Sequence, residues 1–220
     1  MEGPRPANAA AQRGRLFVIA APSGAGKTSL VRALMEREPG LRFSISCTTR
    51  PRRPSEIHGR DYFFVAKPEF ERMVAAGEFL EHARVFDNAY GTPRRPVEES
   101  LAAGRDLILE IDWQGAAQVR RALPECRSIF ILPPSRAELE RRLRGRRTDT
   151  EEVIQRRLRD AAADMTHWRE FDSVVVNDDF QRAVDDLQAI VAGRGEASRR
   201  ERDGLAALAA ELTRTAPAGG

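Results

Sequence analysis

Residues 21–28, with the sequence APSGAGKT, constrain the fold of this chain more than any other stretch. They follow an apolar run at 16–20 that predicts a short buried strand, and they precede residues 29–35, whose apolar spacing predicts a helix. A strand, a glycine loop, a lysine, a hydroxyl and a helix, in this order, form a phosphate-binding P-loop. The sequence therefore predicts a site for nucleotide phosphates near its N-terminal end.

The residue types of this loop suit a bound triphosphate. Gly24 and Gly26 allow positive φ, which turns backbone N–H groups inward, and the following helix adds the partial positive charge of its N-terminus. Lys27 is expected to reach the β- and γ-phosphates, and the Thr28 hydroxyl is expected to bind Mg²⁺. Ala21 replaces the first glycine of the strict motif. The alternative interpretation is a glycine turn that contains a lysine by chance.

The composition bounds the class of protein. With 220 residues, of which 41% are hydrophobic, the chain suits one globular domain with insertions. A net charge of +3 is small for a chain in which 31% of residues are charged, so no general nucleic-acid binding is expected. Cys47 and Cys126 lie far apart, which fits free thiols in a reducing cytoplasm. No signal peptide and no apolar run approaching ~18 residues is present, so we expect no membrane span.

The segment at 44–92 differs from its surroundings. Its predicted elements are strands at 42–46, 62–65 and 78–86, a polar loop at 47–61 and a helix at 69–76. We therefore expect a small β-rich insertion between two βα units.

The loop of this insertion is rich in arginine with few counter-charges. Its basic residues and the neutral donors near them are Arg50, Arg52, Arg53, Arg60, Thr48, Thr49, Tyr62 and Tyr90. Arginine binds a phosphate bidentately, so one interpretation is a site for a phosphate monoester. A solvated basic loop is the other.

The α/β pattern resumes after the insertion. A strand at 107–112 ends in Asp112, and an acid at the carboxyl end of a parallel strand is where a P-loop fold places its metal-side carboxylate. Alternatively, Asp112 only caps the helix that follows. Further strands are expected at 128–132 and 173–176, and helices at 97–103 and 179–192.

Two arginine clusters, at 141–147 and 156–159, flank a short hinge. The functional interpretation is a lid that closes over a nucleotide, excludes water and balances the charge of a transferring phosphoryl group. The alternatives are a solvated helix pair with i,i+4 ion pairs and an RNA-binding patch, for which only Trp168 lies nearby as a stacking residue. Beyond 193 the chain is polar. Leu205, Leu208 and Leu212 show weak helical spacing, and 213–220 is expected to be disordered.

Seven stretches together resemble the guanylate kinase family. They are APSGAGKTSL (21–30), SISCTTRPRRPSEIHGRDYFF (44–64), FLEHARVFDNAYGT (79–92), LEIDWQG (109–115), RSIFILPPS (127–135), RRLRGRRTDTEEVIQRRL (141–158) and VVNDD (175–179). The resemblance implies an α/β P-loop nucleoside-monophosphate kinase: a parallel sheet flanked by helices, with a small β-rich insertion and a helical lid. It also implies the reversible, Mg²⁺-dependent reaction of ATP with GMP or dGMP to give ADP and GDP, in cytoplasmic purine metabolism.

The resemblance also assigns residues. The ATP-binding residues are Ala21, Pro22, Ser23, Gly24, Ala25, Gly26, Lys27 and Thr28, with Asn177 beside the adenine. The GMP phosphate is held by Arg50, Arg53, Tyr62 and Tyr90, the guanine is read by Ser46, Glu81 and Thr92, and Glu110 and Asp112 complete the GMP side. Thr28 and Asp112 face the metal. The catalytic charges are Lys27, Arg50, Arg142, Arg146 and Arg157.

The chemistry of Glu81 explains its assignment. Guanine presents N1–H and N2–H₂ as adjacent donors, and a carboxylate accepts both, whereas adenine offers an acceptor at N1. Two positions depart from the family pattern besides Ala21. Ser55 stands where the GMP loop usually has glycine, and Glu110 stands where aspartate is frequent.

The implied organisation has seven parts. These are an N-terminal arm (1–13), core segments (14–43, 93–135 and 161–196), the GMP-binding insertion (44–92), the lid (136–160) and a flexible C-terminal tail (197–220). Two other functions are compatible with the fold. Peptide-binding modules of scaffold proteins share it, typically with a damaged P-loop, and a P-loop kinase could serve another phosphate acceptor.

Overall fold

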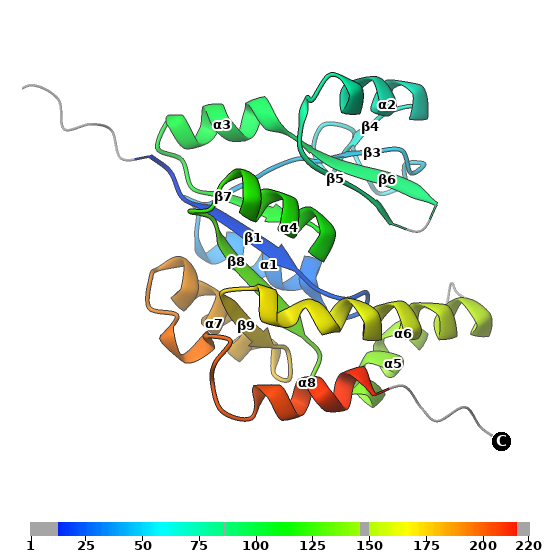
Figure 1. The fold of residues 1–220 in the computed structure, drawn as a ribbon, viewed down its shortest axis with the longest axis vertical. Coiled ribbons are helices and arrows are strands. Elements are labelled where there is room, and N and C mark those ends of the chain that lie inside the picture. Colours follow the sequence, from blue (N-terminus) through cyan, green and yellow to red (C-terminus); the bar gives the residue numbers. More distant parts are fainter. Residues whose placement is uncertain (1–12, 86, 146–149, 215–220) are drawn as a thin grey trace, which may run out of the picture.

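A parallel sheet of five strands forms the centre of the molecule (Figure 1). The computed structural model describes residues 13–85, 87–145 and 150–214. The strand order is β2-β7-β1-β8-β9, and every pairing between neighbours is parallel. The strands are β1 (Leu16–Ala20), β2 (Arg42–Phe43), β7 (Leu107–Glu110), β8 (Arg127–Leu132) and β9 (Ser173–Val176). This arrangement confirms the predicted fold class.

Helices cover both faces of this sheet, and the alternation of side chains along β1 shows how. Phe17 and Ile19 point to the face covered by α1 (Lys27–Arg37) and α7 (Phe180–Val191). Leu16, Val18 and Ala20 point to the opposite face. The helices of that face include α3 (Arg94–Ala102), α4 (Trp113–Ala122), α5 (Arg136–Arg144) and α6 (Glu151–Met165). A strand buried on both faces needs a continuous apolar run, which is what residues 16–20 supply.

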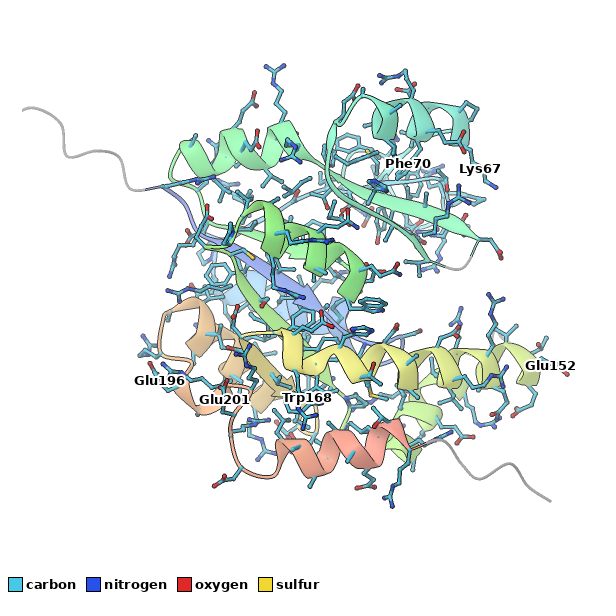
Figure 2. All side chains as sticks on the ribbon, viewed as in Figure 1. Lys67, Phe70, Glu152, Trp168, Glu196 and Glu201 are labelled. Carbon is cyan, nitrogen blue, oxygen red and sulfur yellow. The ribbon has the colours of Figure 1, made fainter. Side chains whose placement is uncertain are left out.

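A second, four-stranded sheet lies at one end of the molecule, above the central sheet in Figure 1. Its order is β4 (Phe63–Phe64), β3 (Cys47–Thr48), β6 (Asn88–Pro93) and β5 (Phe79–Val85), and α2 (Lys67–Ala75) covers it. Phe70 points from α2 toward this sheet (Figure 2) and stacks on Phe79 with ring centroids 4.6 Å apart. The β-rich insertion thus has a small hydrophobic core of its own.

The prediction of one strand at 42–46 is wrong. Residues 42–43 pair with β7 in the central sheet, whereas residues 47–48 pair with β4 and β6 in the second sheet. The chain crosses between the sheets in this interval. A continuous alternating pattern in the sequence therefore covers two short strands.

The prediction for the C-terminal segment is also wrong in part. Residues 205–213 form helix α8 (Leu205–Thr213), and its buried residues Leu205, Ala209 and Leu212 belong to the main core. Helix α8 packs against α6 and against the 3₁₀ helix Thr166–Glu170, whose Trp168 lies between α6 and α8 (Figure 2). The expectation of a flexible tail is wrong for this stretch. Residues 1–12 of the expected arm and 215–220 lie outside the described residues.

None of the helices within the described ranges is long and apolar enough to cross a membrane.

Candidate active site

A cleft of about 670 Å³ lies where the two sheets and helix α6 meet. One wall is the P-loop, the second comes from the small sheet, and the third comes from α6. Residues that line it include Gly24, Gly26, Lys27 and Thr28 of the P-loop, Ser46, Tyr62, Glu81 and Tyr90 of the insertion, and Arg156, Asp160 and Asp164 of α6. The cleft therefore brings the predicted ATP side and the predicted GMP side into one space.

The backbone of the P-loop has the predicted geometry. Gly24 and Gly26 adopt φ of 91° and 95°, which confirms that both need the left-handed region. Helix α1 begins at Lys27, so its N-terminal amides face the loop. The Lys27 Nζ donates to the Ile111 carbonyl at 2.7 Å, and the Thr28 hydroxyl donates to Glu110 at 2.5 Å.

Two residues hold the P-loop from behind. The buried Asn177 side chain, 5% exposed, donates from Nδ2 to the Ala25 carbonyl at 2.7 Å. The Arg142 guanidinium donates to the same carbonyl at 3.4 Å and to the Asn177 carbonyl at 3.0 Å. A Cβ at Gly26 would lie 2.5 Å from Asn177 Nδ2, so the Asn177 side chain can reach Ala25 only because residue 26 is glycine. Sequence reasoning expected Asn177 near the adenine and Arg142 in the lid, and did not anticipate this bracing contact.

The three residues expected to read guanine form one hydrogen-bonded chain. The Thr92 hydroxyl donates to Glu81 Oε1 at 2.6 Å, and the Ser46 hydroxyl lies 3.3 Å from the Thr92 hydroxyl. Glu81 and Thr92 are partners across the β5–β6 pair, which places both side chains on the same face. The structure thus brings Ser46, Glu81 and Thr92 together.

The environment of Glu81 is unusual for a carboxylate. The residue is 3% exposed, and this burial raises its pKa to about 7, although the Thr92 hydrogen bond acts in the opposite direction. The nearby Asp112 raises the pKa further, and Lys27 lowers it. A buried carboxylate of this kind favours a ligand that brings hydrogen-bond donors to both oxygens.

The arginine loop of the insertion has a counter-charge that sequence reasoning missed. Arg50 binds the Glu56 carboxylate with both terminal nitrogens, at 2.6 and 3.1 Å, and both side chains are 14% exposed. The guanidinium also lies over the Tyr62 ring, at 5.7 Å, and interacts with Tyr90. Arg53 donates its backbone N–H to Glu56, at 2.8 Å, while its side chain is exposed.

The turn that contains Ser55 is closed by a hydrogen bond from the Glu56 N–H to the Arg53 carbonyl at 3.1 Å. The loop therefore forms a turn with serine in place of the glycine that is usual there.

The remaining predicted residues lie as follows. Asp112 caps helix α4: its carboxylate accepts from the Gly115 N–H at 2.8 Å and from Gln114 at 3.1 Å, and it also lines the cleft. Both interpretations of Asp112 are therefore compatible with the structure. Arg157 is half-buried on α6. Arg146 lies outside the described residues.

A P-loop that follows the central strand of a parallel sheet, with a β-rich insertion that forms a second wall of the same cleft, is the architecture of a P-loop nucleoside-monophosphate kinase. A model of the guanylate kinase family matches residues 13–194, and the chain belongs to this family. Guanylate kinases from Methylococcus capsulatus and Sodalis glossinidius are 56% and 54% identical to it, over 91% and 88% of this chain and 98% and 93% of their own. The crystal structure of guanylate kinase from Anaplasma phagocytophilum covers 84% of this chain and 88% of its own, with a TM-score of 0.70 and 34% identity.

Membership of this family makes the chain a transferase that moves a phosphoryl group from ATP to GMP. The prediction from sequence motifs is thereby confirmed at the level of family and activity.

Proposed function

We propose that this chain carries out the reversible, Mg²⁺-dependent transfer of the γ-phosphate of ATP to GMP or dGMP in the cytoplasm, with the residues assigned above. One observation carries the assignment of the site. The buried Glu81, which is joined to Thr92 and Ser46, faces the same cleft as the P-loop. A guanine read by Glu81 would therefore have its phosphate within the space that the P-loop serves.

On the ATP side, the backbone of residues 21–28 would bind the β- and γ-phosphates, and Lys27 would balance their charge. Lys27 would exchange its bond to the Ile111 carbonyl for a phosphate oxygen. Asn177 and Arg142 would keep the loop in shape through Ala25, which is a positioning role.

On the GMP side, Arg50 and Arg53 would bind the phosphate together with Tyr62 and Tyr90. The side chain of Arg50 is held by Glu56 through its two terminal nitrogens, and neither of these bonds uses Nε–H. Nη1 also donates to the Pro51 carbonyl at 2.7 Å, so Nε–H is the donor that these contacts leave for a phosphate.

The residues at the P-loop fit a magnesium ion. The Thr28 hydroxyl meets a carboxylate oxygen of Glu110, and Asp112 lies on the same cleft. Across the described ranges, no group of three or more His, Cys, Asp or Glu forms a cage for a metal. Mg²⁺ matches this pattern because it is usually held by one or two protein oxygens together with water and substrate phosphates. When bound, it neutralises phosphate charge; Thr28 with Glu110 or Asp112 would hold it.

Both substrates are anions, so the principal task of the protein is to hold them together. Lys27, Arg50, Arg142, Arg146 and Arg157 would supply the positive charge for this purpose. Closure of the insertion (44–92) and the lid (136–160) over the core would exclude water and align the GMP oxygen with the γ-phosphorus. The transfer needs no nucleophile from the protein.

A coupled assay of ADP release tests the proposal, with AMP, GMP, dGMP, CMP and UMP as acceptors, in Mg²⁺ and in excess EDTA. We expect turnover with GMP and dGMP only, and loss of turnover in EDTA. Lys27→Met, which removes a charge contact of the transition state, should lower kcat by at least ~100-fold. Equal rates for AMP and GMP, or a near-normal rate of Lys27→Met, would contradict the assignment.

A further inference from the structure

Helix α4 contains a glycine in its first turn, where glycine is unfavourable. Gly115 is the third residue of α4 (Trp113–Ala122), and it is buried. A glycine inside a helix is less favourable than alanine, because it loses more backbone freedom on folding. The conformation gives no reason for the choice, because Gly115 is absent from the glycines with positive φ among the described residues.

The space beside Gly115 gives the reason. A Cβ at this position would lie 2.4 Å from Glu81 Oε2, 3.0 Å from the Glu81 carboxyl carbon and 3.3 Å from Asp112 Oδ1. A contact of 2.4 Å is far inside the van der Waals distance, so either the helix or the carboxylate would have to move. The carboxylate of Glu81 therefore occupies the place that any other residue at 115 would need for its side chain.

Glu81 has little freedom to avoid such a contact. Its other oxygen accepts the hydrogen bond of Thr92 at 2.6 Å, and Thr92 is fully buried and in turn lies beside Ser46. Gly115 is fixed as well, because its N–H donates to the Asp112 cap at 2.8 Å. The two elements that carry these residues, β5 and α4, lie in direct contact.

We propose that Gly115 is a specificity-determining residue. Because it has no side chain, it leaves the space that the Glu81 carboxylate occupies, and this space orients the carboxylate toward guanine. The inference rests on the proposed reading of guanine by Glu81. With Oε1 held by Thr92 and Oε2 against Gly115, the carboxylate has a single orientation in the wall of the cleft. Guanine needs this orientation because its N1–H and N2–H₂ must meet two oxygens at once. Gly115 itself touches neither substrate in this account, so it is a positioning residue.

The substitution Gly115→Ala tests the proposal. We expect KM for GMP to rise at least ~10-fold, because a buried hydrogen-bonding pair would be misaligned, while KM for ATP changes less than ~2-fold. The preference for GMP over AMP should fall by a similar factor. Gly40→Ala is the matched control, since a Cβ at Gly40 meets nothing within 4 Å, and it should leave both KM values unchanged.

A second variant identifies Glu81 as the partner. Glu81→Asp shortens the side chain by one methylene and withdraws the carboxylate from the space beside residue 115. The double variant Gly115→Ala/Glu81→Asp should bind GMP clearly better than the product of the two single effects predicts. If Gly115→Ala does not fold, the double variant should recover folding, because the contact that prevents folding is removed.

Three results would overturn the inference. They are an unchanged KM for GMP in Gly115→Ala, an equal rise of both KM values, and strict additivity in the double variant. A failure of the proposed function is distinguishable from all three, since it would appear as wild-type protein without GMP-dependent ADP release.

Discussion

Arg50 and Glu56 form a bidentate ion pair inside the loop expected to hold the GMP phosphate, with nitrogen–oxygen distances of 2.6 and 3.1 Å. The pair is mostly buried, and its strong hydrogen bonds lower the pKa of Glu56. Its position suggests that Glu56 orients Arg50 before the substrate arrives, so that the guanidinium does not have to be ordered on binding.

We therefore predict that Glu56→Gln raises KM for GMP by about 3- to 10-fold without changing KM for ATP. Loss of a charge-assisted pair leaves Arg50 less ordered, and such bonds contribute about 1.5–3 kcal/mol. Steady-state kinetics with each substrate varied in turn measures the effect. The matched control is Glu99→Gln, which removes an exposed ion pair with Arg95 on a helix and should leave KM for GMP unchanged. An unchanged KM for GMP in Glu56→Gln would contradict this role, and a lower KM would show that Glu56 opposes phosphate binding instead.

The contact of Asn177 with Ala25 separates two roles for this asparagine. If Asn177 braces the P-loop, Asn177→Ala should raise KM for ATP and for other nucleoside triphosphates by a similar factor. It should also lower the unfolding free energy by about 1–3 kcal/mol, because the Ala25 carbonyl loses its buried donor. If Asn177 reads the adenine, as the family resemblance implied, the preference for ATP over GTP should fall with little change in stability. Donor selectivity and urea unfolding of the same variant distinguish the two.

Helix α8 leads to a prediction about the C-terminal segment. Truncation after Gly204 removes Leu205, Ala209 and Leu212 from the core beside α6. The two leucines alone contribute about 1.5–3 kcal/mol each, so Tm should fall by roughly 10 °C in thermal unfolding. Truncation after Arg214, which keeps α8 and the bond from Arg136 to the Arg214 carbonyl, should leave Tm unchanged. Equal Tm values for both truncations would show that α8 does not contribute to the stability of the core.

The sequence predicted the parts of the molecule that depend on local chemistry. The positive φ of Gly24 and Gly26 follows from the motif, and the strand at 16–20 follows from its apolar run. The cluster of Ser46, Glu81 and Thr92 depended on the family resemblance. Glu81 lies on β5, Thr92 lies on β6 and Ser46 lies in the connection just before β3, so no local sequence pattern joins the three residues.

What the sequence did not predict depends on tertiary contacts. The stripe that buries α8 includes Ala209 between Leu205 and Leu212, and alanine carries too weak a hydrophobic signal to mark a core face. The pairing of Arg50 with Glu56 occurs inside an irregular loop, where no periodicity connects residues six apart. The space at Gly115 lies between a helix and a strand that are distant in sequence, so it depends on how these two elements pack.

The raised pKa of Glu81 predicts how GMP binding depends on pH. Burial raises this pKa from 4.5 to about 7 in the free protein, so a large share of the protein holds Glu81 protonated at neutral pH. Guanine donates to the carboxylate and favours the ionised form; GMP should therefore bind with release of a proton below about pH 7. KM for GMP should rise as pH falls, by up to tenfold per unit, whereas KM for ATP should not follow the same profile.

The ionisation of Glu81 also affects the stability of the fold. Because the pKa is higher in the folded state than in the unfolded state, ionisation destabilises the fold as pH rises from about 4.5 to 7, and bound GMP should reverse this loss. Calorimetric titrations in buffers of different ionisation enthalpy count the released protons directly. Asp164 lines the same cleft, and burial raises its pKa to about 6, so Asp164→Asn is the necessary control and should retain the GMP profile. Glu81→Gln should abolish proton release; persistent release in that variant would assign the titration to another group.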